Sequence, residues 1–92
     1  MISITAIIKS KKESTDEVKE MVHHLVNSTR NEAACIRYDL HYTDNIFIIW
    51  EEWTDQAGLD IHNKQTYLLD FIAKTENLLA TPIQVYKTTQ VL

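Results

Sequence analysis

The residue best suited to proton transfer is His62, which lies near the start of the second helical region of the sequence. Imidazole titrates close to neutral pH, so a neutral ring that faces a pocket could remove the proton of a phenol. The alternative is a histidine that only packs or caps between two helices.

Four aromatic residues are candidates for the wall of a pocket. Indole and phenol rings stack on planar molecules, while their N–H and O–H groups orient polar atoms. Trp50 and Tyr67 are the better candidates, and Tyr38 and Trp53 complete the set. Because aromatic residues on strands and helices usually belong to the core, packing is the alternative for each of them.

Charged residues lie on two neighbouring segments with the pattern of strands. Arg37 and Asp39 are on the first segment, and Glu51 and Glu52 are on the second. Arg37 could hold an anionic group of a substrate, or it could form an ion pair across the strands or at a dimer interface. The ion pair is the favoured interpretation, and Arg37 and Glu51 are kept as candidate substrate contacts.

The sequence does not predict a metal site or a reactive thiol. The carboxylates lack the histidine and cysteine companions that a metal site would require, and adjacent histidines such as His23 and His24 point about 100° apart on a helix. The single cysteine, Cys35, cannot form an internal disulfide, and only distant histidines could act as its base. We expect it to be a packed or idle thiol.

Length and charge exclude several classes of protein. With 92 residues, the sequence predicts one domain over residues 1–92. A net charge of −4 without a long basic run argues against nucleic acid as a partner. No apolar segment approaches the length of about 20 residues that crosses a membrane. The N-terminus alternates like a strand and lacks the basic leader of a signal peptide, so we expect a cytoplasmic location.

Hydrophobic periodicity predicts four strands and two helical regions. Ser14, Thr15 and Asp16 are candidate N-caps of the first helix, and Asp55 is a candidate N-cap of the second helical region. In chain order we expect a strand at residues 2–9, a helix at about 15–30, strands at 35–42 and 46–53 joined by a turn at 43–45, a helical region in two parts that ends at Pro82, and a closing strand at 83–92.

This order predicts an α+β fold of the ferredoxin-like type, the split β-α-β arrangement. Both helices should lie on one face of a four-stranded antiparallel sheet. Residues 46–53 are apolar on both faces and Ile7 lies opposite Ile2, Ile4 and Ile8, so the other face would be an apolar patch larger than soluble monomers usually expose. We therefore expect a homodimer in which two such faces meet as a dimeric α+β barrel.

Two segments are the most specific in the sequence: EAACIRYDL, from Glu32 to Leu40, and IWEEWTDQAGLDIH, from Ile49 to His62. Together they resemble the antibiotic biosynthesis monooxygenase family. The resemblance covers nearly the whole chain in element order and length. It implies ferredoxin-like dimers, several of which oxidise phenolic or quinol-type aromatics with molecular oxygen and without flavin or metal. Other members isomerise a phosphorylated sugar derivative or degrade haem, so the fold leaves the reaction open.

The sequence departs from this family immediately after His62. Family members commonly continue with Thr-Pro-His, whereas here residues 63–67 are Asn-Lys-Gln-Thr-Tyr, so Tyr67 replaces the second histidine. A phenol can donate a hydrogen bond and could hold a substrate oxygen there. Residues 64–79 contain no histidine, which argues against haem degradation because that branch takes its iron ligand from a histidine on this helix.

We therefore expect a monooxygenase without a cofactor that acts on a small phenolic or quinol-like molecule. His62 would be the base, Tyr67 the hydrogen-bond donor and Trp50 a wall of the pocket. Two alternatives remain. One is a module that binds a small ligand without turnover, and the other is a cofactor-free isomerase of a small carbonyl or phosphorylated compound, with Arg37 as the anion clamp.

Overall fold

Four strands and three α-helices follow one another along residues 1–92, all of which the computed structural model describes. The strands form one antiparallel sheet in the order β2-β3-β1-β4. The predicted ferredoxin-like α+β fold is therefore confirmed. The elements are β1 (Ile2–Lys9), a short 3-10 helix η1 (Lys12–Ser14), α1 (Thr15–Thr29), β2 (Cys35–Thr43), β3 (Ile46–Trp53), α2 (Gln56–Asn63), α3 (Thr66–Thr75) and β4 (Gln84–Thr88).

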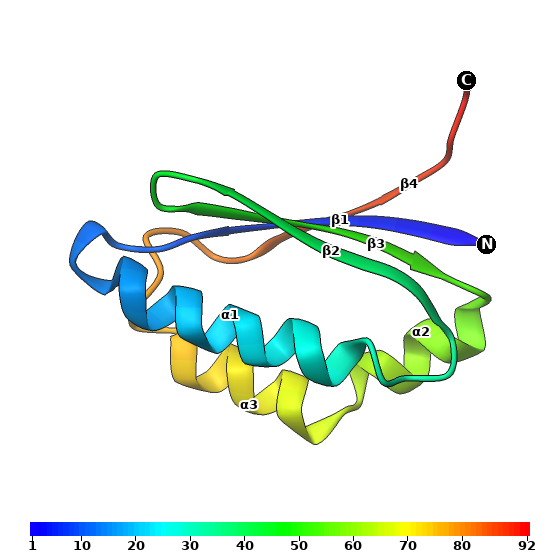
Figure 1. The fold of residues 1–92 in the computed structure, drawn as a ribbon, viewed down its shortest axis with the longest axis horizontal. Coiled ribbons are helices and arrows are strands. Elements are labelled where there is room, and N and C mark those ends of the chain that lie inside the picture. Colours follow the sequence, from blue (N-terminus) through cyan, green and yellow to red (C-terminus); the bar gives the residue numbers. More distant parts are fainter.

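The molecule has two layers, a sheet and a layer of helices. In Figure 1 the helices α1, α2 and α3 lie together on one side of the sheet, and no element covers the other side. We call the covered side the inner face and the uncovered side the outer face. Beyond β4 the chain runs away from the helix layer to the C-terminus (Figure 1).

Alternation along the two central strands decides which side chains meet the helices. In β1, Ile4, Ala6 and Ile8 are buried, while the residues between them point to the outer face. In β3, Phe47 and Ile49 are buried on the inner face. The alternation that the sequence predicts for β1 and β3 is confirmed, because a period of two separates the faces of any strand.

The start of β2 differs from the prediction. A register shift between Cys35 and Arg37 places Cys35 opposite Trp53, where it packs against the core. In a regular strand Ile36 would lie on the same face as the buried Tyr38, but Ile36 is 53% exposed. The cause is a β-bulge, which adds one residue to a strand and reverses the alternation on one side of it.

The second helical region ends earlier than predicted, at Thr75 instead of Pro82. The chain after α3 binds the end of β1: the Lys11 amide donates to the Leu78 carbonyl (2.9 Å) and the Ala80 amide to the Lys9 carbonyl (2.8 Å). Backbone groups committed to these bonds cannot continue the helix.

The closing strand is shorter than predicted and is exposed throughout. Only Gln84–Thr88 pairs, with residues 3–7 of β1, and every residue of β4 is solvent-exposed. Alternation continues to residue 92 in the sequence, but pairing with β1 stops at Thr88, which lies opposite Ser3. Residues 89–92 therefore lie outside the sheet.

Of the predicted N-caps, Asp55 forms the expected side-chain hydrogen bond and Ser14 does not. Asp55 caps α2, since its Oδ1 accepts a hydrogen bond from the Gly58 amide at 2.7 Å. Ser14 occupies the N-cap of α1 without a side-chain cap. The η1 turn precedes α1 directly, and the Thr15 hydroxyl interacts with Ser10 at 2.9 Å instead.

Candidate active site between the sheet and the helices

A cavity of about 160 Å³ lies between the inner face of the sheet and the helices. Twelve of its fifteen lining residues are hydrophobic, and the other three are Glu51, His62 and Asn63. Tyr38 also lines it. A mostly apolar hollow with a few convergent polar groups is the usual form of a small-molecule site.

His62 reaches this cavity from the last turn of α2. Its ring is almost fully buried, and Nδ1 lies 2.7 Å from Oε2 of Glu32, on the loop between α1 and β2. A carboxylate only accepts hydrogen bonds, so Nδ1 carries the proton that it donates to Glu32. The other ring nitrogen, Nε2, is then the one available to a ligand in the cavity.

Glu32 holds a small hydrogen-bond network together. Its Oε2 also accepts a hydrogen bond from the Tyr67 hydroxyl, and Oε1 accepts one from Gln65 Nε2 at 3.3 Å. Burial, followed by the bond to Glu32, raises the pKa of Tyr67, so its hydroxyl stays protonated and remains a donor. Tyr67 is not among the residues that line the cavity with His62, and it is connected to that residue through Glu32.

Two further aromatic residues hold the imidazole in place. The Trp53 ring centroid lies 4.5 Å from that of His62, and the Tyr38 ring meets His62 edge-on at 5.7 Å. Burial, followed by the nearby Glu51, raises the pKa of Tyr38, which keeps its hydroxyl protonated. The imidazole therefore has restricted freedom to rotate.

Glu51 is the second acidic residue at the cavity. Only 6% of its surface is exposed, and Oε1 accepts a hydrogen bond from Trp53 Nε1 at 3.0 Å. Burial raises the pKa of this carboxyl group to about 7; the charge of Glu32 adds to the rise and the bond from Trp53 opposes it. Removing a carboxylate from water disfavours its charged form.

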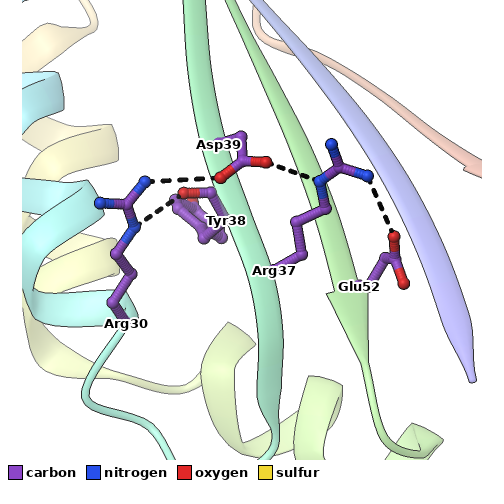
Figure 2. A network of polar contacts seen from close by, with 5 residues as sticks. All are labelled: Arg30, Arg37, Tyr38, Asp39 and Glu52. Carbon is purple, nitrogen blue, oxygen red and sulfur yellow. Dashed lines mark hydrogen bonds and ion pairs between the residues drawn. The ribbon is translucent and has the colours of Figure 1, made fainter.

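Arg37 lies away from the cavity, on the outer face. Its Nε donates to Oδ2 of Asp39 at 2.6 Å and its guanidinium contacts Glu52 across the strands at 3.4 Å (Figure 2). Arg30, at the end of α1, donates to the Tyr38 carbonyl at 3.1 Å and to Asp39 at 3.5 Å. The predicted ion pair of Arg37 is confirmed, and the pair with Asp39 lowers the pKa of that carboxyl.

Trp50 shares the outer face with Arg37 and is 47% exposed. Its ring stacks on that of His41 at 5.3 Å, and the Arg37 guanidinium lies 5.6 Å above it. Within one chain, the sheet separates Trp50 and Arg37 from His62. The seven predicted site residues thus fall into three groups. Tyr38, Glu51 and His62 line the cavity; Trp53 contacts Glu51 and His62, and Tyr67 is connected to His62 through Glu32; Arg37 and Trp50 lie on the opposite face.

Glu32 and Gln65 belong to this hydrogen-bond network, although no sequence pattern indicates a role for either of them. Glu32 is the first residue of the segment EAACIRYDL, but nothing local connects it to a histidine thirty positions later. A buried histidine needs a hydrogen-bond partner for its N–H group. The sequence could therefore predict that a buried His62 has a polar partner, but it could not show which residue that partner is.

The structure holds no cluster of three histidine, cysteine, aspartate or glutamate side chains that could bind a metal ion. None of its helices combines the length and the apolar character that membrane spanning requires.

Comparison with known proteins places this architecture in a recognised group. The family model described as "Antibiotic biosynthesis monooxygenase" matches residues 1–74. The protein named "Putative monooxygenase YcnE" from Bacillus subtilis is 34% identical over 91 residues, which cover 96% of each chain. A crystal structure described as an antibiotic biosynthesis monooxygenase has a TM-score of 0.93 at 28% identity, with all of both chains covered. The crystal structure of PA3566 from Pseudomonas aeruginosa has a TM-score of 0.90 at 26% identity, covering 99% of this chain and 94% of that one.

Proposed function

The chain belongs to the antibiotic biosynthesis monooxygenase family, and from this membership and its cavity we propose that it is a monooxygenase that needs no cofactor. Its substrate is a small phenolic or quinol-like aromatic. The observation that carries the proposal is the bond from His62 to Glu32, which leaves the second imidazole nitrogen for the cavity.

In the first step His62 removes the proton of a substrate hydroxyl through Nε2. The imidazolium that forms keeps its Nδ1–H bond to Glu32, whose negative charge stabilises it, as in other histidine–carboxylate pairs. Tyr67 and Gln65 donate to the same carboxylate and hold it towards His62. Tyr67 is therefore proposed as a positioning residue, which acts on the substrate only through Glu32.

In the second step the phenolate reacts with dioxygen. For a phenol with a free para position, one oxygen atom forms the new carbonyl group of the quinone and the other leaves as water. The ring supplies all four electrons, and the two hydrogen atoms of the water come from the hydroxyl group and the para carbon. The proton that His62 accepted returns to the leaving oxygen. The apolar lining protects the reactive anion from bulk water.

The proposal includes a homodimer formed through the outer face. Ile7, Ile48 and Trp50 lie on this face, where no element of the chain covers them. A second copy would bury them against the same residues around a two-fold axis.

A binding role without turnover is the second candidate. It is favoured by the position of the Tyr67 hydroxyl, which contacts Glu32 and not the cavity. The isomerase alternative required Arg37 as an anion clamp. Since Arg37 is paired with two carboxylates on the outer face, the placement of its side chain gives that alternative no support.

The test is oxygen uptake with a panel of small phenols and quinols, for the wild type and for His62→Ala. Uncatalysed oxidation is subtracted, and ¹⁸O₂ is used to detect one labelled oxygen in the product. His23→Ala is the matched control, because His23 is exposed on α1. Uptake that requires His62 but not His23 supports the proposal. Saturable binding without any uptake would establish the binding role instead.

A further inference from the structure

The carboxyl group of Glu51 is a buried acid at the cavity that the proposed proton transfer does not use. Its Oε1 accepts the hydrogen bond from Trp53, and no other group of the chain donates to or pairs with it. Every fully enclosed polar side-chain atom in this structure has a hydrogen-bond partner. The second oxygen, Oε2, has none, so it is not fully enclosed and can meet a molecule in the cavity that Glu51 lines.

No positive charge faces Glu51 from the elements around it. From β2 it meets Tyr38 directly across the strands, and from α2 it shares the cavity with His62. The nearby Glu32 is itself acidic. Lys87 on β4 is exposed and donates to a side chain of α2. The α1, α3 and β1 residues that line the cavity are apolar. An unpaired charge in such a place is costly, so the neutral acid is the stable form.

Resting on the function proposed above, we propose that Glu51 selects the substrate, by donating a hydrogen bond to a second oxygen on an uncharged aromatic ring. A neutral carboxylic acid has one O–H donor beside its acceptor oxygen. Oε1 accepts from Trp53, which leaves the O–H of Oε2 for the ligand. Aromatic carboxylates are excluded, because they would bring a charge into an apolar cavity without a cation.

Binding of the selected ligand should weaken as the pH rises. Glu51, with a pKa of about 7, donates below neutral pH and is a charged acceptor above it. Affinity for the selected ligand should therefore fall roughly tenfold between about pH 6 and about pH 8, as the fraction of neutral acid falls. Ionisation of the ligand itself is followed by its absorbance and corrected for.

Three probes of similar size separate the effect of the second oxygen from the effect of its charge. Their binding is measured by calorimetry in the absence of turnover. 4-Hydroxyacetophenone has a hydroxyl group and a neutral second oxygen, 4-hydroxybenzoate has a charged group there, and 4-ethylphenol has no oxygen there. At about pH 6 we expect the wild type to bind the first probe roughly tenfold more tightly than either of the others, the size of one buried hydrogen bond.

Two substitutions at Glu51 make the test specific. Glu51→Gln stays neutral and keeps a donor, so it should retain the preference and bind equally well at both pH values. Glu51→Leu removes the donor, so 4-hydroxyacetophenone should bind no better than 4-ethylphenol. Glu52→Gln on the outer face is the control and should behave like the wild type. If the leucine variant fails to fold, the glutamine variant still decides the question.

Several results would overturn the inference. These are equal affinity for the ketone and the carboxylate, a pH dependence that persists in Glu51→Gln, or no binding of any probe. None of them bears on the labelled-oxygen experiment. Conversely, selective binding through Glu51 without oxygen uptake would refute the monooxygenase and leave the role of Glu51 standing.

Discussion

Gly58, in the first turn of α2, lies directly against Ala34, on the loop before β2, and leaves no room for a methyl group between them. Glu32 is two residues before Ala34, and His62 is about one helical turn after Gly58. This contact therefore holds together the two segments that the Glu32–His62 hydrogen bond joins.

Gly58→Ala tests this close contact. In an unconstrained helix the substitution would stabilise the protein by up to about 1 kcal/mol. Here we expect a loss of about 1–3 kcal/mol, because the new methyl group overlaps the side chain of Ala34. Urea unfolding measures the change, and adding Ala34→Gly should restore much of it. An unchanged or higher stability of the single variant would contradict the contact.

The histidine–carboxylate pair predicts a specific pattern of rates. His62→Ala should lower kcat by about 10²–10⁴-fold, the usual contribution of a general base. Glu32→Gln should also lower kcat, because a neutral amide cannot stabilise the imidazolium. Since Glu32 acts through His62, the double variant should be no slower than His62→Ala alone. Additive losses in oxygen-uptake kinetics would mean that the two residues work independently.

Glu51 makes stability depend on pH. Its pKa is near 4.5 when unfolded and about 7 when folded, so the folded state binds more protons between these values. The stabilisation from the neutral acid is fully present below about pH 4.5 and is lost as pH rises to about 7. A tenfold change in proton affinity corresponds to about 1.4 kcal/mol, so the loss is of order 3 kcal/mol.

Urea unfolding of the wild type and Glu51→Gln, at about pH 5 and about pH 8, checks this prediction. The glutamine variant should gain stability relative to the wild type at the higher pH. Glu52→Gln serves as the control, since Glu52 lies on the outer face beside Arg37. Parallel pH profiles for Glu51→Gln and the wild type would contradict the raised pKa.

Ile48→Glu tests the proposed dimer. Ile48 lies on the outer face opposite Ile7, so a charge there should dissociate two copies that meet through this face. Sedimentation should then show a single chain of 10.7 kDa, compared with twice that mass for the wild type. Ile61→Glu is the control, because Ile61 is exposed on α2. A wild type that sediments as the single chain would refute the dimer.

Local sequence patterns predict most of the strands and helices, but they do not predict which residues meet at the candidate site. The period of two along β3 correctly predicts that Trp50 and Trp53 lie on opposite faces of the sheet. It does not show which of the two faces meets the helices, and for this reason the aromatic wall predicted around His62 includes Trp50. The bulge at the start of β2 is also invisible in the sequence, because Ile36, Tyr38 and Leu40 alternate with polar residues as they would in a regular strand.

The sequence by itself determined the type and order of the elements, the antiparallel α+β architecture and the family. The elements and the architecture follow from residue periodicity, which neighbouring residues define among themselves, and the family follows from the resemblance of residues 32–40 and 49–62. The tertiary structure decided that Glu32 bonds to His62, that Tyr67 contacts this carboxylate and not the cavity, and that Glu51 is buried without a cation. Each of these depends on segments distant in the chain, whose packing sets both the contacts and the cost of a buried charge.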